Sequence, residues 1–304
     1  MNEEHYHEPV MLKECLDGLV IEPDGIYVDV TYGGGGHSKA ILNQLGENGH
    51  LFGFDQDIDA TTQLIQDDRL TFVQHNFRFL KRFLRLEGVT QVDGILADLG
   101  VSSHQLNEAE RGFSYRFDAL LDMRMNQVGE VTAADILRTY NVEQLQQIFS
   151  DYGEVRNAKT LAQAIVAERE NREIKTITDF LTILGPLVRG RRARYLAQVF
   201  QALRIEVNDE MGALRDFLTE ALEVLKPGGR LVVMSYHSLE DRYVKNFIKK
   251  GSFDGEFIKD DFGKIYRPFK IITKKAVEAS AEELKINSRA RSAKLRIAEK
   301  TLDV

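Results

Sequence analysis

The chain has 304 residues, 43% of them apolar and 29% charged, which is typical of a globular protein and enough for two domains. Its single cysteine, Cys15, excludes an internal disulfide, and the polar start "MNEEHYHEPVM" is unlike a signal peptide, so we expect a cytoplasmic protein without a membrane partner. The formal net charge of -7 argues against a nucleic-acid binder if charge is counted over the whole chain, so its distribution has to be examined.

The first hundred residues alternate short apolar runs with segments of helical spacing. This alternation predicts a parallel, doubly wound sheet in an α/β fold. Strands are expected over 26–30, 51–55, 70–74 and 92–100, and helices over 38–45 and 58–65.

After Gly100 only helical patterns follow, until the strand signal returns in "LKPGGRLVVMSYHS". There Pro227-Gly228-Gly229 predicts a turn into an apolar strand over 231–234. The alternating segments "FKIITKK" and "AKLRIAEK" predict an antiparallel pair near the end of the chain. The expected organisation is an α/β domain formed by 1–106 and 204–304, interrupted by a helical insertion over 107–203.

Basic residues are concentrated in two stretches. Between Leu181 and Ile205 there is no acidic residue, and five arginines fall inside: Arg189, Arg191, Arg192, Arg194 and Arg204. From Arg242 to Lys300 there are sixteen Lys and Arg against eight Asp and Glu. A solvated face explains such stretches as well as a polyanionic partner does, and both interpretations stay open on charge alone.

Four consecutive glycines lie between a predicted strand and a predicted helix in "VDVTYGGGGHSKAIL", residues 28–42. The dinucleotide frame G-x-G-x-x-G fails from Gly33 and from Gly34, and no Gly-Lys-Ser/Thr completes a phosphate-binding loop. Asp55, however, ends the second strand about twenty residues later, where a carboxylate can accept hydrogen bonds from ribose hydroxyls. The pattern therefore favours a nucleoside ligand without a pyrophosphate, with a purely structural turn or a nicotinamide or flavin site as alternatives.

S-adenosylmethionine fits this description, because it combines a nucleoside with a sulfonium and an amino-acid end. The glycine turn would let the backbone approach the amino-acid end, and the helix beginning near His37 would offer free N–H groups to its carboxylate. Asp29, just before the turn, would face the ammonium group.

Two more segments end at the same edge of the predicted sheet, where open α/β sheets bind ligands. "HNF", residues 75–77, follows the third strand, and "ADLGVSSHQL", residues 97–106, follows the fourth. Phe77 would stack on an adenine or pack in the core. Asp98 would face the substrate or cap the next turn.

Seven long motifs in order make the chain resemble a known family. They are "HEPVM" (7–11), "DVTYGGGGHS" (29–38), "DLGVSSHQL" (98–106), "AERGFSYRFDALLDMRM" (109–125), "FQALRIEVNDE" (200–210), "PGGRLVVMSYHSLEDR" (227–242) and "NSRARSAKLRIAEK" (287–300). Together they resemble the bacterial 16S ribosomal RNA methyltransferases that methylate the N4 atom of a cytosine in the decoding centre. In place of the Asn/Asp-Pro-Pro-aromatic motif of many amine methyltransferases, the chain has Asp98-Leu99-Gly100-Val101.

The resemblance implies a Rossmann-like methyltransferase fold with a helical domain inserted after the fourth strand, S-adenosylmethionine as the cofactor, and 16S rRNA within the small subunit as the partner. It also implies a set of cofactor contacts: Gly35, Gly36, His37, Asp55, Phe77, Asp98 and Gln105. The basic stretches would then contact RNA phosphates.

Methylation of cytosine N4 needs a group that accepts hydrogen bonds from the amine as positive charge develops. Asp98 is the first catalytic candidate and His237, in "SYHSLEDR", the second, although a structural histidine explains that position equally well. No metal-ligand spacing is present in the sequence, so no metal is expected. Three rival functions are an oxidoreductase, a non-catalytic RNA-binding protein and a methyltransferase of another substrate.

Overall fold

The computed structural model describes residues 9–259 and 262–301. The chain divides into two compact units, one that runs to Gly100 and resumes at Gly212, and a second formed by Val101–Met211. The second unit extends further at both ends than the insertion expected over 107–203. At its C-terminal end the reason is helix α9, Arg192–Asn208, which continues through residue 203 without a break.

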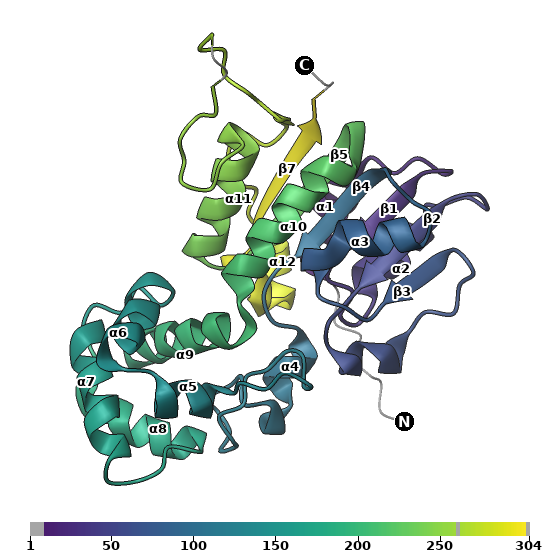
Figure 1. Ribbon diagram of the computed structural model, residues 1–304. Helices are drawn as coiled ribbons and strands as arrows, with labels where there is room; N and C mark the ends of the chain where they lie inside the picture. Colours follow the sequence, from purple (N-terminus) through teal and green to yellow (C-terminus); the bar gives the residue numbers. More distant parts are fainter. Residues whose placement is uncertain (1–8, 260–261, 302–304) are drawn as a thin grey trace. The chain divides into compact units, whose positions relative to one another are not determined.

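The first unit is built on a seven-stranded sheet in the order β3-β2-β1-β4-β5-β7-β6. Neighbouring strands from β3 to β5 are parallel, and β7 runs antiparallel between β5 and β6 (Figure 1). The strands are β1 (Ile26–Asp29), β2 (His50–Phe54), β3 (Leu70–Val73), β4 (Val92–Asp98), β5 (Leu225–Ser235), β6 (Phe269–Ile271) and β7 (Lys294–Lys300). This order confirms the predicted α/β, Rossmann-like fold and the antiparallel pair near the end of the chain.

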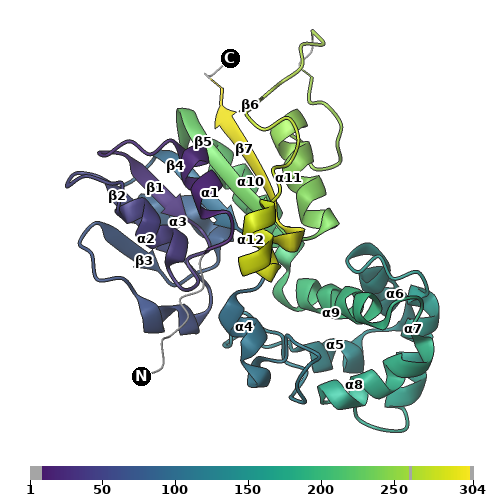
Figure 2. The same cartoon turned by 180° about the vertical axis from the view of Figure 1, so that it is seen from behind.

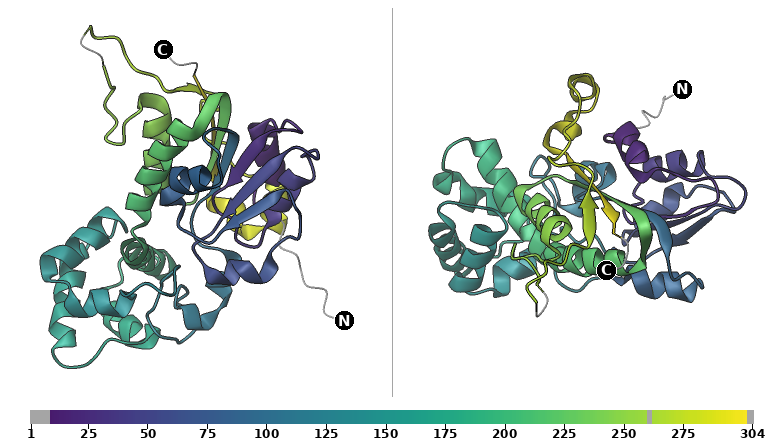
Figure 3. Two further views of the ribbon diagram at one scale, coloured as in Figure 1. Left: turned by 45° about the vertical axis from the view of Figure 1, so that its right-hand side comes forward. Right: turned by 90° about the horizontal axis from the view of Figure 1, so that it is seen from above.

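Helices cover both faces of this sheet, as its buried, apolar strands require. Helices α3 and α10 lie on the face seen in Figure 1, and α1 and α2 lie on the opposite face, seen in Figure 2 and from two further sides in Figure 3. The helices of this unit are α1 (Leu12–Leu19), α2 (Gly36–Leu42), α3 (Leu80–Leu86), α10 (Glu210–Val224, whose first two residues belong to the second unit), α11 (Ser238–Lys250) and α12 (Ala281–Ile286), with the short 3-10 helices η1 (Ile58–Gln63), η2 (Phe77–Phe79) and η5 (Ser288–Ser292).

The second unit is helical throughout its regular structure and has a hydrophobic core of its own. Its elements are α4 (Ser103–Asn107), η3 (Ala109–Arg111), α5 (Ala133–Thr139), α6 (Val142–Asp151), α7 (Ala158–Arg169), α8 (Ile177–Leu184), η4 (Gly185–Leu187) and α9. Capping boxes begin α5, α6 and α8, at Thr132, Asn141 and Thr176. In the described part of the chain, no helix combines the length and the apolar character that crossing a bilayer requires.

Two local predictions were wrong. The helix expected over 58–65 is the 3-10 helix η1, because Thr61 and Thr62 use their hydroxyls to bond the carbonyls of Ile58 and Asp59, each at 2.7 Å, and such bonds compete with α-helical ones. The turn expected at 227–229 is an irregularity within β5. There the pairing with β4 jumps from Val92–Leu225 to Gly94–Arg230, and Gly228 adopts φ 83°, as in a bulged strand.

Candidate active site

The candidate site lies in the first unit, at the edge where the parallel strands end. β1 and β4 are adjacent and end at Asp29 and Asp98, and Asp55 directly follows β2. The chain leaves β1 toward β2 on one side and reaches β4 on the other, so this edge is the point at which the strand order reverses. Ligands of open α/β sheets bind at such a point.

The backbone conformation and the close packing of the turn require glycine at most positions of the run. Gly33 and Gly35 adopt φ values of 51° and 75°, which favour glycine. A Cβ on Gly35 would also lie 2.8 Å from the Tyr32 hydroxyl, and one on Gly36 would lie 2.4 Å from Cγ of Pro9. Three of the four glycines therefore have a structural reason, and the run alone does not identify a ligand.

Asp55 holds the glycine turn by hydrogen bonds from two backbone groups. The Gly33 N–H donates to Oδ2 at 2.8 Å, and the Asp57 N–H donates to Oδ1 at 2.9 Å. Burial raises the pKa of Asp55 to about 6, against the lowering effect of these two bonds. Each carboxylate oxygen has a second lone pair, so the bonds leave acceptor capacity for ribose hydroxyls.

Asp29 is buried and connects β1 to α2. Its Oδ1 accepts the Thr31 N–H at 3.1 Å, and its Oδ2 accepts the Ser38 hydroxyl at 2.7 Å. These bonds give the residue a structural purpose. A contact with the ammonium group of a ligand stays a prediction.

Asp98 is held from both sides. The Tyr236 hydroxyl, directly after β5, donates to Oδ1 at 2.7 Å, while the Asp98 N–H donates to the Thr31 hydroxyl oxygen at 2.7 Å. Oδ2 lies 3.9 Å from Nδ1 of His37. Burial raises the pKa of the Asp98 carboxyl to about 6, although His37 and Tyr236 both act to lower it. The side chain is still 23% exposed, so a bound molecule can reach it.

His37 is buried in the first turn of α2, and its ring connects this site to the N-terminal segment. Nε2 lies 3.1 Å from the Val10 carbonyl oxygen. Because a carbonyl only accepts, Nε2 carries a proton and Nδ1 is the atom that faces Asp98. The hydrogen bond from Nε2 to the Val10 carbonyl fixes the orientation of the ring, and it uses one of the two ring nitrogens.

The carboxylates at this edge of the sheet are suited to a cationic cofactor. Asp29, Asp55 and Asp98 lie near enough for Asp29 to raise the pKa values of the other two. A pyrophosphate would be repelled by three carboxylates, whereas a ligand carrying a sulfonium and an ammonium group would relieve their repulsion. The three carboxylates are therefore more compatible with a cationic ligand than with a pyrophosphate.

Two further residues expected to contact the cofactor have structural contacts of their own. Phe77 begins η2, is half-buried and packs edge-on against Phe217 of α10, with 5.4 Å between ring centroids. Its contact with adenine stays a prediction. Gln105 belongs to the second unit, where it is buried and forms a capping box with Ser102 at the start of α4. Its contact with the cofactor also stays a prediction.

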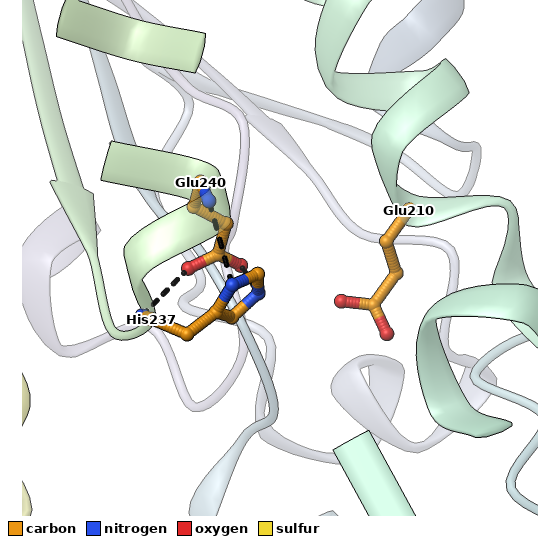
Figure 4. Close-up of side chains that lie close together, drawn as sticks. All are labelled: Glu210, His237 and Glu240. Atoms are coloured by element: carbon orange, nitrogen blue, oxygen red, sulfur yellow. Dashed lines mark hydrogen bonds and ion pairs between the residues drawn. The ribbon is translucent and has the colours of Figure 1, made fainter. Parts of the chain in front are cut away.

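His237 is the N-cap of α11 (Figure 4). Its Nδ1 accepts the Glu240 N–H at 3.4 Å, and its Nε2 lies 3.0 Å from Oε1 of Glu240. The helix cap explains the Nδ1 contact, whereas the buried Nε2 atom makes no hydrogen bond of good geometry with the described residues. Glu210, also labelled in Figure 4, is described with the second unit, where its two carboxylate oxygens accept from Arg204 at 2.7 and 2.8 Å.

Sequence reasoning missed Tyr236 and Thr31, the two residues that hold Asp98. Tyr236 directly precedes the histidine that was singled out, at the end of an apolar strand, and that position could have indicated it. Thr31 carried no such signal, because a hydroxyl in a turn has many ordinary uses.

Comparison with known proteins identifies the family. Residues 4–301 match the model of the MraW methylase family. This chain belongs to the MraW methylase family.

MraW-family relatives are similar over almost their whole length. A protein named ribosomal RNA small subunit methyltransferase H from Bacteroides thetaiotaomicron is 56% identical, over 97% of each chain. A protein of the same name from Flavobacterium johnsoniae is 56% identical, over 97% of this chain and 98% of its own. A solved rRNA methylase from Streptococcus thermophilus is 12% identical, with a TM-score of 0.42 over 96% of this chain and 95% of its own, and adds nothing to the strand order described above.

Family membership establishes that the protein is a methyltransferase and that S-adenosylmethionine is its cofactor. It agrees with the three carboxylates at the edge of the sheet, and it excludes the oxidoreductase considered from the sequence.

Proposed function

We propose that this protein methylates the exocyclic N4 of a cytidine in the decoding centre of 16S rRNA, within the small ribosomal subunit and in the cytoplasm. The names of its relatives and the ordered motifs of the chain support an RNA substrate of this kind. The observation that carries the chemistry is the position of Asp98. It is a partly exposed carboxylate at the reversal point of the sheet, oriented by the Tyr236 hydroxyl, and its backbone N–H donates to Thr31.

Cytosine N4 is a poor nucleophile, because its lone pair is delocalised into the ring. When bound, S-adenosylmethionine supplies the methyl group on a sulfonium. The protein has to orient the amine and accept hydrogen bonds from it as its positive charge develops. Asp98 can do this because an ionised carboxylate only accepts, and because the Tyr236 hydroxyl orients the carboxylate while Thr31 accepts from the backbone N–H of Asp98. The same carboxylate can instead hold the cofactor's ammonium group.

The basic stretch of the second unit supports RNA binding. Arg189, Arg191, Arg192 and Arg194 are all exposed, and none forms an ion pair with the residues that the structure describes. Helix α9 begins in this stretch without an acidic residue in its first turn and without a side-chain cap. Cations at a helix N-terminus oppose the helix dipole, so this arrangement costs stability unless an anion binds there. RNA phosphates would provide that anion.

The test of the substrate is transfer of a tritiated methyl group to small subunits from cells that lack this protein, followed by nucleoside analysis of the RNA. We expect one labelled N4-methylated cytidine derivative, which maps to the decoding centre. Label in another nucleoside, or in protein, would contradict the proposal while leaving the methyltransferase activity in place.

A further inference from the structure

Several cations of the C-terminal basic region, Arg242 to Lys300, already have partners within the fold. Arg296 forms two hydrogen bonds with Asp241, at 2.7 and 3.0 Å, and Lys270 pairs with Glu299. Lys300 donates to the Leu225 carbonyl at 2.8 Å. These cations stabilise the sheet and α11. Because they are already paired, they are poor candidates for contacts with a polyanionic partner.

Three cations between α12 and the start of β7 are placed differently. Lys285 of α12 and Arg291 of η5 are exposed, and Lys294, the first residue of β7, is half-buried. None of the three has a side-chain hydrogen bond or an ion pair with the described residues. We call Lys285–Lys294 the edge segment.

The strand register places the edge segment beside the candidate active site. Lys294 pairs with Ser235, the last residue of β5, and the preceding residue, Met234, pairs with Asp98. The segment therefore arrives at the edge of the sheet where Asp98 and Tyr236 lie, within the same unit. A chain entering β7 at its first residue has to pass this edge, since β7 runs antiparallel to β5.

The edge segment is held firmly by its small residues. Ala290 and Ala293 are buried in the core that contains Val10 and Met11, and the Asn287 side chain accepts the Arg289 N–H at 3.2 Å. Just before the segment, Glu283 accepts the Met11 N–H at 2.7 Å. Cations presented from an anchored backbone lose less conformational entropy on binding than cations on a free loop.

We infer that the edge segment binds the RNA phosphates next to the target nucleotide. The inference rests on the proposed function and deepens it, because it names a second RNA contact, in the unit that holds the cofactor. RNA is favoured over an acidic protein because the target base has to be unstacked and held at this edge, and phosphates flank it on both sides. The segment offers Lys285, Arg291 and Lys294, and its sequence from Lys285 to Lys294 contains no carboxylate.

The test compares two double variants of the full-length protein. Arg291→Gln with Lys294→Gln removes two cations from the edge segment. Arg82→Gln with Arg85→Gln is the matched control, since both arginines are exposed on α3, which leads into the opposite end of β4. Binding of a fluorescein-labelled RNA hairpin with the decoding-centre sequence is measured over a range of KCl concentrations, together with S-adenosylmethionine affinity by calorimetry.

We expect the edge variant to reduce the slope of log affinity against log salt by about 0.7–0.9 for each lost phosphate contact, with S-adenosylmethionine affinity unchanged. The control should keep the wild-type slope. An edge variant with the wild-type slope, or a control that loses as much, would overturn the inference. Methyl transfer by the wild type to unmodified small subunits is measured in parallel, and its absence would count against the proposed function independently of the salt slopes.

Discussion

At the scale of single residues, the site depends on carboxylates that are used twice. Asp55 supports the glycine turn through Gly33 and Asp57, and it is also the proposed ribose ligand. Replacement by alanine would remove both functions together. A variant that keeps one acceptor oxygen is therefore more informative.

We predict that Asp55→Asn remains folded and binds S-adenosylmethionine more weakly. Losing a hydrogen bond to a charged acceptor costs about 1.5–3 kcal/mol, which corresponds to a tenfold or greater rise in the dissociation constant. Calorimetry at pH 7.5 measures the affinity, and thermal unfolding of the free protein controls for the turn. A folded variant with the affinity of the wild type would remove Asp55 from the ribose contact.

We predict that Asp98→Asn is inactive and more stable than the wild type above pH 6. The folded pKa of Asp98 is about 6, above the usual 3.8, so the folded state binds the proton more tightly than the unfolded state. Its contribution to the free energy of unfolding is largest below pH 3.8 and is lost as the pH rises through 6; because the side chain is partly exposed, the loss is expected to be on the order of 1–3 kcal/mol.

The asparagine keeps an acceptor for Tyr236 and carries no charge, so this loss should disappear. Chemical denaturation of both proteins at pH 4 and pH 7.5 measures it. An equal difference between the two proteins at both pH values would contradict the raised pKa. If S-adenosylmethionine affinity also collapses, Asp98 is mainly a cofactor ligand.

We predict that Tyr236→Phe moves the acidic limb of the pH–rate profile upward by about one pH unit. The hydroxyl lowers the pKa of Asp98 together with His37, while Asp29 and Glu240 raise it. One hydrogen bond to a charged group is worth about 1.5 kcal/mol or more, and one pH unit corresponds to 1.36 kcal/mol. A change of rate without a shift of the limb would mean that Tyr236 only supports packing.

At the scale of elements, substitutions of His237 at the start of α11 distinguish a structural role of this residue from a catalytic one. Asparagine is among the best N-caps, whereas alanine at this position loses about 1 kcal/mol. We predict that His237→Asn keeps both stability and methyl transfer, and that His237→Ala loses stability. Denaturation and single-turnover assays test both variants. A stable but inactive His237→Asn protein would make His237 catalytic, against the interpretation favoured here.

The N-terminus of α9 is the second element that carries a prediction. We predict that replacing Arg191, Arg192 and Arg194 together by alanine weakens RNA binding, lowers the salt slope by about 0.7–0.9 per lost contact and leaves S-adenosylmethionine affinity unchanged. Removing cations that oppose the helix dipole should also stabilise the second unit slightly. An unaltered salt slope would show that these arginines are only a solvated face.

At the scale of the whole molecule, the chain has a net charge of -7, but its exposed cations without ion-pair partners among the described residues include two local groups. The exposed arginines at α9 lie in the second unit, and the edge segment lies in the first. The carboxylates Asp29, Asp55 and Asp98 are partly or fully buried near one another at one edge of the sheet. The net charge therefore does not describe the local environments. The group of carboxylates is suited to a cationic cofactor, and the two groups of cations are suited to RNA.

The sequence by itself determined the architecture. Apolar runs of strand length and the segments between them are local signals, so the parallel sheet, the returning strand and the helical insertion were all predictable from pattern and order. Asp55 and Asp98 were predictable for the same reason, since parallel strands bring their carboxyl ends to one edge. The exact element types at 58–65 and at 227–229 were not, because side-chain bonds from Thr61 and Thr62 and the register of β5 against β4 decided them.

Only the tertiary structure decided what each site residue touches. That Tyr236 donates to Asp98 depends on two strands separated by more than a hundred residues, and no local pattern encodes such a pair. The same holds for the glycines, three of which are required by Tyr32, Pro9 and the backbone itself, and for His237, whose ring caps a helix. Charge counts likewise miss which cations are already paired, since Arg296 and Asp241 meet only in the folded chain. Contacts between distant residues are fixed by packing and register, and for that reason the roles of these residues lie beyond what sequence spacing can determine.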